Sequence, residues 1–237
     1  MFLSDPEHTP YDVKFTLRGF PVRIHPFFWI MMLFIGAGVG GAQALILWVL
    51  AAVVSILLHE LGHALAFRLF GIHSSITLYA FGGVTVPAPS YGTRRLRPQD
   101  DILISVAGVA FQYALAFLIV LAYAVKNGVS VPEQFMSGAF SGFGMYPDLF
   151  LFLLFYISFF WATLNIMPIY PLDGGHISQK ILSWLSPRWG MVMTLYLSIL
   201  FALGLGAYFF FQGSYFGAIL FGSLAYSNMQ MLSPRNY

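Results

Sequence analysis

Long apolar stretches separated by short polar segments dominate the hydropathy pattern of the chain. A helix that crosses a hydrocarbon core about 30 Å thick needs about 20 consecutive apolar residues. Six stretches approach or exceed that length, and the first is the shortest of them. They cover residues 26–41, 42–70, 102–125, 149–167, 191–211 and 215–232. The pattern predicts an all-α polytopic membrane protein with six transmembrane helices.

Composition supports this prediction and excludes other protein classes. Apolar residues make up 59% of the 237 positions and charged residues only 8%, and the mean hydropathy is +0.78. A soluble domain usually has about 25% charged residues because its surface faces water. The chain is therefore not a soluble globular, disordered or coiled-coil protein, nor one that binds nucleic acid through a basic face. It has no cysteine, which excludes disulfides and thiolate metal sites.

Basic residues orient the predicted spans. If six helices cross with both termini in the cytosol, ten of the eleven Lys and Arg residues fall on the cytosolic side, and only Lys126 falls outside. Such an excess of positive charge inside is typical of membrane proteins. The alternative is five spans with one long kinked segment at 26–70, which scatters these charges over both sides. The charges favour six spans, and the compact form suits a prokaryotic inner membrane.

Two segments outside the spans alternate apolar and polar residues, as β-strands do. Residues 13–24 predict a small hairpin at the cytosolic surface, within an N-terminal segment of 1–25 that shows no cleavable signal peptide. Residues 72–86 predict a second hairpin, with a Gly-Gly turn at Gly82 and Gly83. The other predicted parts are a membrane domain at 26–232, an outer loop within it at 128–147, and a cytosolic tail at 233–237.

Three ionisable residues lie in the interior of the second apolar stretch, away from its ends, where such groups are costly and functional by default. His59, Glu60 and His63 form an H-E-x-x-H motif. At positions i and i+4 of a helix, two imidazoles project from one face and can bind a single Zn²⁺, with the glutamate as general base. The alternative is a hydrogen-bonded polar cluster between helices. It leaves the cost of burying three polar groups largely uncompensated, whereas a metal removes most of it.

Asp173 is the candidate for the third ligand that a hydrolytic zinc site needs. Pro168 and Pro171 end the fourth apolar helix before it, and two glycines follow it. We therefore expect Asp173 on a stiff, non-helical tip. Two alternatives stay open, namely that Asp173 caps the next helix and that His176 is the third ligand. His25 and His73, beside span ends or in a hairpin, are expected to be structural.

The depth of the motif gives an independent check. His63 lies seven residues before Phe70, which is about 10 Å along a helix. The second span runs inward, so the metal is expected in the cytosolic half of the membrane. The fourth span also runs inward, and Asp173 follows its inner end. Two motifs 110 residues apart in sequence are thus expected in the same leaflet.

These motifs resemble those of the site-2 protease family of intramembrane zinc metalloproteases. The H-E-x-x-H motif matches the first metal motif of the family, and residues 165–175 match its N-x-x-P-x-x-x-L-D-G pattern in type and order. The resemblance implies that His59, His63 and Asp173 are the zinc ligands and Glu60 the catalytic base. It further implies that Asn165 holds the substrate or stabilises the oxyanion.

Two further positions are interpreted through this resemblance. The sequence Phe81-Gly82-Gly83-Val84 resembles the Gly-Gly hairpin of the family, which implies that it engages the substrate as an added strand. Family members often have a Gly-Pro pair followed by Asn in the third span, whereas this chain has Val109 and Gln112 there. The departure concerns packing or a supporting hydrogen bond rather than the metal chemistry. No PDZ or CBS domain is expected.

The predicted function is hydrolysis of a peptide bond in or near a transmembrane segment of another membrane protein, with zinc as cofactor and the lipid bilayer as surroundings. The motif alone leaves open a membrane zinc-binding protein without protease activity, such as a carrier, a scaffold or a hydrolase of a non-peptide bond. A carrier needs polar residues through both leaflets, but the outer half of the second span offers only Gln43 and Ser55. No nucleic-acid partner is expected, and the sequence predicts neither the substrate nor the oligomeric state.

Overall fold

The computed structural model describes residues 6–80, 82–88, 96–138 and 140–233 of the chain. The strands are β1 (Val13–Leu17), β2 (Phe20–Ile24), β3 (Ser74–Tyr79) and β4 (Gly82–Pro87). The helices are α1 (Pro26–Gly36), α2 (Gly41–Leu69), α3 (Pro98–Asn127), α4 (Val131–Ser137), α5 (Met145–Asn165), α6 (Asp173–Leu185), α7 (Gly190–Phe211) and α8 (Tyr215–Met231). The chain is thus mostly helical with a small sheet.

Within the described residues, four helices are long and apolar enough to cross a membrane, namely α2, α3, α5 and α7. The chain is therefore an integral membrane protein with several candidate spans. The two other predicted segments are also helical but shorter. Helix α1 has 11 residues and α8 has 17. The prediction of helices in all six stretches is confirmed, while six crossings remain a prediction.

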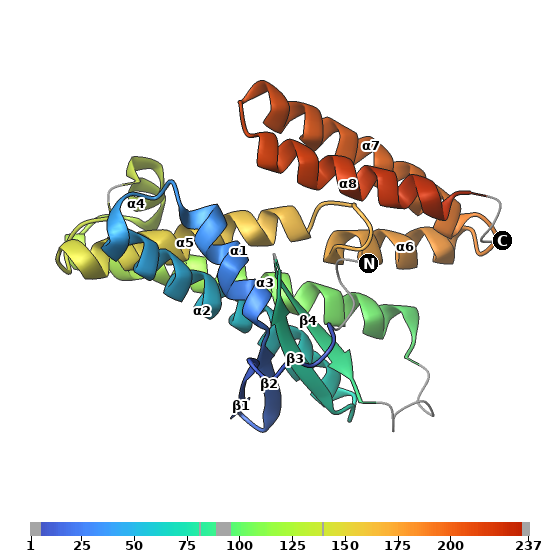
Figure 1. The fold of residues 1–237 in the computed structure, drawn as a ribbon, viewed down its shortest axis with the longest axis horizontal. Helices are drawn as coiled ribbons and strands as arrows, with labels where there is room; N and C mark the ends of the chain where they lie inside the picture. The colour runs from blue at the N-terminus through green and yellow to red at the C-terminus, as the bar shows by residue number, and fades with distance from the viewer. Residues whose placement is uncertain (1–5, 81, 89–95, 139, 234–237) are drawn as a thin grey trace. The chain divides into compact units, whose positions relative to one another are not determined.

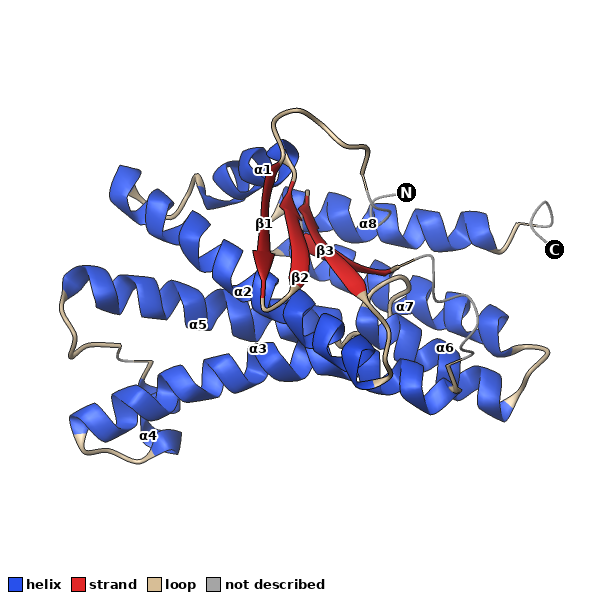
Figure 2. Cartoon of the chain, turned by 90° about the horizontal axis from the view of Figure 1, so that it is seen from below, coloured by secondary structure: helices blue, strands red, loops and turns tan. Residues whose placement is uncertain are grey.

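Both predicted hairpins form, and they join into one sheet. In the described part of the chain the strand order is β1-β2-β3-β4. Each hairpin is antiparallel, and the parallel pairing of β2 with β3 connects them, with Val22 opposite Ile76 and Ile24 opposite Leu78. Figure 2 shows β1, β2 and β3 side by side. The inner strands place Ile76 and Leu78 in the core, where both are fully buried.

The predicted Gly-Gly turn of the second hairpin is wrong. Gly82 pairs with Tyr79 and Gly83 with Leu78, so both glycines belong to β4. The chain instead turns after Tyr79, where Ala80 has a positive φ of 48°, and position 81 lies outside the described residues. The glycines are therefore not there to make a turn. At Gly83 the reason is a close approach of the strand to a side chain, described below.

A buried arginine fixes the polar N-terminal segment to the sheet. Arg23 of β2 donates hydrogen bonds to the Asp12 carboxylate at 3.1 Å and to the backbone oxygen of Pro6 at 2.8 Å. Burial alone raises the pKa of Asp12, but hydrogen bonds from Thr9 and from Arg23 outweigh it and hold this pKa well below its usual value. The segment before β1 is thus tied down by charge-assisted bonds rather than by apolar packing.

The segment 128–147, which the sequence predicts to be an outer loop, contains helix α4. Ser130 accepts a hydrogen bond from the backbone N–H of Glu133, and the Glu133 carboxylate accepts one from the N–H of Ser130, which makes a capping box. These bonds lower the pKa of Glu133. Asp148, in the first turn of α5, accepts hydrogen bonds from the backbone N–H groups of three residues before it, 142–144. Local polar bonds therefore order this loop.

The chain divides into two compact units, each with its own core. The first comprises residues 1–94 and 107–162, and the second residues 95–106 and 163–237. The first core joins the sheet to α1, α2, α3 and α5 through buried residues such as Phe28, Ile56 and Tyr123. In the second unit α8 lies along α7, and α6 also packs on α7 (Figure 1). Ile169 and Phe221 belong to the core of this second unit.

Candidate metal centre

The two histidines of the H-E-x-x-H motif face each other on one side of α2. His59 and His63 are buried, and their Nε2 atoms lie 3.0 Å apart. Two imidazole nitrogens that bind one tetrahedral zinc ion at about 2.05 Å are separated by about 3.3 Å. The two rings therefore already converge on one point at nearly the separation that such an ion requires, and their donor set suits zinc.

Two glycines let α2 and α3 approach closely at this point. A Cβ on Gly62 of α2 would lie 2.6 Å from the backbone oxygen of Ala107. A Cβ on Gly108 of α3 would lie 2.9 Å from Cε1 of His59 and closer still to the ring of His63. Both glycines lie inside helices, where glycine costs about 1 kcal/mol relative to alanine. Packing against the imidazoles explains why Gly108 is a glycine.

The hairpin of β3 and β4 fixes the glutamate of the motif. Glu60 is buried, and the hydroxyl of Thr85 in β4 lies 2.7 Å from its Oε2 and 3.0 Å from its backbone oxygen. A Cβ on Gly83 would lie 2.6 Å from Oε1 of Glu60. Gly83 and Thr85 share one face of β4 because side chains alternate along a strand. The close approach of β4 to this carboxylate is the reason for glycine at position 83.

A buried polar cluster lies one helical turn before His59. Ser158 of α5 donates a hydrogen bond to Oγ of Ser55 at 2.9 Å, and Nε2 of Gln112 in α3 donates to the same oxygen at 3.0 Å. All three side chains are fully buried. Gln112, one of the two departures from the family pattern, therefore takes part in a buried hydrogen bond beside the motif. It links three helices next to the motif.

Two of the predicted site residues, Asn165 and Asp173, belong to the second unit. Asn165 is the last residue of α5 and Asp173 the first of α6, and both are half-buried. The prediction that the proline segment ends the helix is confirmed, because α5 stops three residues before Pro168. The non-helical tip is wrong for Asp173 itself, which starts α6, with Leu172 as its N-cap.

The two glycines after Asp173 allow the chain to fold back on itself. A Cβ on Gly174 would meet the backbone of residues 166 and 167, and one on Gly175 would lie 2.5 Å from the carbonyl carbon of Ile169. The loop before α6 therefore packs directly on the first turn of that helix. The backbone holds Asp173 at a fixed place within its unit.

The remaining histidines differ in role. Nδ1 of His25 accepts a hydrogen bond from the N–H of Phe27 at 3.1 Å and caps α1, and its ring packs on Tyr79. This confirms the structural role expected for His25. His176 lies in the first turn of α6, with its ring against Tyr170 at a centroid distance of 4.9 Å.

Sequence reasoning missed Thr85, Gly108 and the serines of the buried cluster. Thr85 could have been found from the alternation of β4, because it is two residues after Gly83 on the same face. Gly108 could not be assigned, because its role depends on how α3 packs against the imidazoles of α2. The partners of Ser55 lie 57 and 103 residues away in the chain, and no local pattern connects them.

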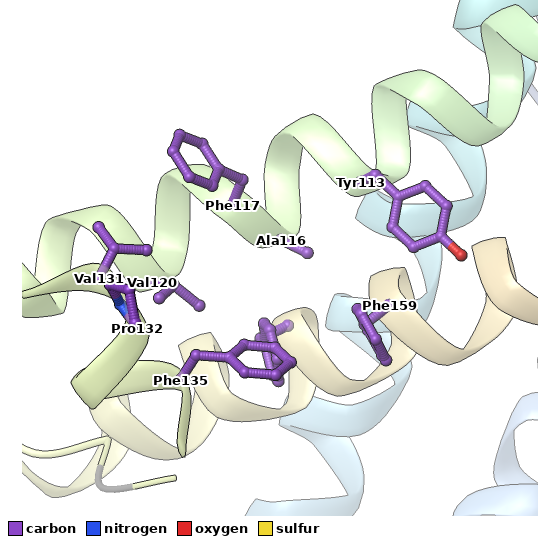
Figure 3. A pocket seen from close by; sticks show the side chains of 9 residues that line it. Tyr113, Ala116, Phe117, Val120, Val131, Pro132, Phe135 and Phe159 are labelled. Atoms are coloured by element: carbon purple, nitrogen blue, oxygen red, sulfur yellow. The ribbon is translucent and has the colours of Figure 1, made fainter. Parts of the chain in front are cut away.

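An apolar cavity of about 330 Å³ lies in the first unit, away from this chemistry. Aromatic rings from α3, α4 and α5 line most of it, as Figure 3 shows for Tyr113, Phe117, Phe135 and Phe159. None of the predicted site residues lines the cavity. It is therefore not the metal centre.

Comparisons with known proteins agree with this geometry. The model of peptidase family M50 matches residues 47–207. Zinc metalloprotease MJ0392 of Methanocaldococcus jannaschii is 27% identical over 180 residues, which cover 73% of this chain and 46% of that protein. Stage IV sporulation protein FB of Bacillus subtilis is 30% identical over 192 residues, covering 80% of this chain and 58% of that protein. The chain thus spans about half the length of the curated relatives it matches.

A solved structure has the same fold. The site-2 protease from Methanocaldococcus jannaschii superimposes with a TM-score of 0.59 at 19% identity, over 93% of this chain and 94% of that one. At 19% identity this match shows that the two chains share a fold, and nothing beyond the fold. The paired imidazoles suit Zn²⁺ as ligands, and MJ0392 is named as a zinc metalloprotease.

Proposed function

We propose, because this chain belongs to peptidase family M50, that it is an intramembrane zinc metalloprotease of the site-2 protease type. Its reaction is the hydrolysis of a peptide bond in or near a transmembrane segment of a membrane-protein substrate. One observation carries the proposal, namely the convergence of the two buried imidazoles beside a buried glutamate on one apolar helix. Such a group of polar side chains in a membrane-spanning helix is expected at a functional site.

The proposed zinc ligands are His59, His63 and Asp173. When bound, zinc supplies Lewis acidity to the scissile carbonyl and to a water molecule. Glu60 accepts the proton of that water and passes it to the leaving amine. Asn165 donates a hydrogen bond to the oxyanion, an interaction that contributes about 3 kcal/mol in comparable sites. The fixed backbone around Asp173 supports its part in this assignment, because a ligand must be presented without mobility.

Thr85 gives the two oxygens of the glutamate different roles. Its hydroxyl lies 2.7 Å from Oε2 of Glu60 and orients the carboxylate. We assign the transfer of the proton to Oε1, because the hydroxyl of Thr85 already bonds Oε2.

The substrate is proposed to add a strand to β4. A helical substrate hides its carbonyl carbons, so it must unwind before cleavage, and pairing with a strand edge replaces the backbone hydrogen bonds it loses. In the described sheet β4 is an edge strand. The residues proposed to engage the substrate are those at positions 81–84, of which Phe81 lies outside the described residues. We propose that Thr85, in the same strand, also engages the substrate.

The pairing of β4 indicates which backbone groups face the substrate. The N–H of Ala88 donates to the backbone oxygen of His73 at 2.8 Å. In an antiparallel pair, hydrogen-bonded residues alternate with residues whose N–H and C=O point away from the partner. By this alternation Val84 and Val86 bond to β3, whereas Gly83 and Thr85 direct their backbone groups to the open edge.

The proposed topology has six membrane-inserted helices, α1, α2, α3, α5, α7 and α8, with both termini in the cytosol. At 1.5 Å per residue α8 is about 25 Å long, and α1 is about 16 Å long and penetrates only part of the bilayer. The distribution of basic residues supports this orientation. It places the site in the cytosolic half of a membrane that we propose to be a prokaryotic inner membrane.

The substitution Glu60→Gln tests the proposal. The amide keeps the shape of the side chain but accepts no proton, so zinc content should stay at one per chain while peptide cleavage falls by about 10²- to 10⁴-fold. The measurements are metal analysis of the purified protein and the cleavage rate of a synthetic transmembrane peptide that the parent protein cuts. Glu133→Gln makes the same chemical change on α4 and should keep both properties.

Two outcomes contradict the proposal. Cleavage by Glu60→Gln at the parental rate would show that Glu60 is not the general base and would contradict the proposed protease mechanism. Zinc binding by the parent protein without cleavage of any peptide in a transmembrane library would favour a zinc-binding protein of another function.

A further inference from the structure

We propose that Ser198 of α7 and Asn228 of α8 are positioning residues that hold Asp173 in place and thereby set the zinc affinity of the site. The inference rests on the proposed role of Asp173 as a ligand. It assigns a task to the last two helices, which carry none of the proposed ligands. Both side chains are polar and fully buried within apolar helices.

Ser198 accepts a hydrogen bond from the loop before α6. Its hydroxyl oxygen accepts from the backbone N–H of Tyr170 at 2.8 Å and donates to the backbone oxygen of Thr194 at 2.7 Å. The second bond directs the lone pairs of the oxygen toward the loop. The position of Tyr170 is thus fixed to one turn of α7.

Asn228 binds the other backbone group of the same residue. Its Nδ2 donates to the backbone oxygen of Tyr170 at 2.6 Å and to that of Leu224, in its own helix, at 2.8 Å. The N–H and the C=O of Tyr170 are therefore both bonded by buried side chains, one from each helix of the α7–α8 pair. The two bonds hold the peptide groups on either side of the Tyr170 Cα and so fix the orientation of this residue as well as its position.

A rigid piece of backbone connects Tyr170 to Asp173. The N–H of Leu172 donates to the oxygen of Ile169 at 2.8 Å, which closes a turn over Tyr170 and Pro171 directly before Asp173. Ile169 is fully buried. A Cβ on Gly175 would overlap the backbone N of Tyr170. With no space between this turn and the start of α6, a shift of Tyr170 moves Asp173 with it.

Thr194 shows how a buried hydroxyl behaves when it serves only its own helix. It lies one turn before Ser198 on α7, is equally buried, and donates to the oxygen of Gly190 at 2.8 Å. Ser223 of α8 likewise donates to the oxygen of Leu220 at 2.7 Å. These two side chains offer controls, because each donates to a carbonyl of its own helix; Thr194 is as fully buried as Ser198, and Ser223 is half-buried.

The test measures zinc affinity of the full-length protein in detergent, by competition with a chelator, for Ser198→Ala and Asn228→Leu. Loss of a group that orients a metal ligand lowers affinity by about 10- to 100-fold, and we expect each variant to fall in this range. Ser198→Thr keeps the hydroxyl and should recover most of the affinity. Thr194→Val and Ser223→Ala should bind zinc like the parent, and circular dichroism reports whether each variant folds.

Combination with Asp173→Ala separates this inference from the proposed function. If Ser198 and Asn228 act through Asp173, their substitution should cause no further loss of affinity once Asp173 is alanine. An equal further loss in that background would overturn the inference while leaving the ligand in place. An unchanged affinity of Asp173→Ala alone would overturn the ligand assignment itself. Unchanged affinity in both single variants would overturn only the positioning role.

Discussion

Gly108 has no side chain, and the space this leaves is filled by the imidazoles of His59 and His63. Alanine would be the better residue for a helix by about 1 kcal/mol, so a substitution here separates helix stability from metal binding. We predict that Gly108→Ala lowers zinc affinity by at least about tenfold, because the added methyl group displaces both rings. The measurement is the same chelator competition.

The control for this substitution is Gly204→Ala in α7, where an added Cβ meets nothing within 4 Å. It should leave zinc affinity unchanged and raise thermal stability slightly. If Gly108→Ala binds zinc like the parent, the imidazoles tolerate displacement, and the tight packing of α3 on α2 is not part of the metal site.

At the level of single residues, the sequence predicts the groups that carry chemistry but not the groups that support them. His59 and His63 could be paired because their spacing on one helix is a local property. Thr85 and Gln112 could not be assigned, because their contacts depend on how a strand and a second helix pack against α2. Asp173 was predicted by type and context, and its place as the first residue of α6 differs from the expected tip.

At the level of elements, hydropathy located every long helix to within a few residues. It missed α4, whose seven residues are stabilised by a capping box and aromatic packing rather than by an apolar run. The parallel pairing of β2 with β3 was also missed, since strands separated by two helices have no local signal for their register. The Gly-Gly pair was assigned to a turn because glycine is common there, whereas Gly83 serves a close approach to Glu60.

The edge of β4 leads to a prediction about the substrate. If the substrate pairs with the backbone groups of Gly83 and Thr85, its own hydrogen-bonded N–H groups must recur at every second residue. We predict that amide-to-ester replacements along a synthetic transmembrane peptide raise KM at alternate positions around the cleaved bond. The measurement is a scan of KM and kcat for single ester substitutions.

Each ester removes one N–H donor and leaves the side chain intact, so the neighbouring positions act as controls for one another. A period of two supports strand addition. Equal effects at all positions, or a period near 3.6, would show that the substrate binds in another way or stays helical.

At the level of the whole molecule, the proposed side of the membrane for each connection rests on the asymmetry of charge. Lys126, near the end of α3, is the single basic residue assigned to the outside, whereas Lys180 and Arg188 lie in and after α6 on the proposed cytosolic side. In the structure Lys180 forms an ion pair with Asp101 at 2.6 Å. This ion pair joins α6 to the first turn of α3, which agrees with the assignment of both ends to one side.

The absence of cysteine makes this topology directly testable, because any introduced cysteine is the only thiol in the chain. We predict that Val129→Cys, between α3 and α4, reacts with a membrane-impermeant maleimide in intact bacterial cells, and that Pro187→Cys, between α6 and α7, reacts only in inverted membrane vesicles. Both positions are exposed in the structure, so both should react equally in detergent. Labelling of position 187 but not of position 129 in intact cells would reverse the orientation and place the metal site in the outer leaflet. Labelling of both positions in intact cells would mean that an even number of crossings separates them, and the six-span arrangement would have to be abandoned.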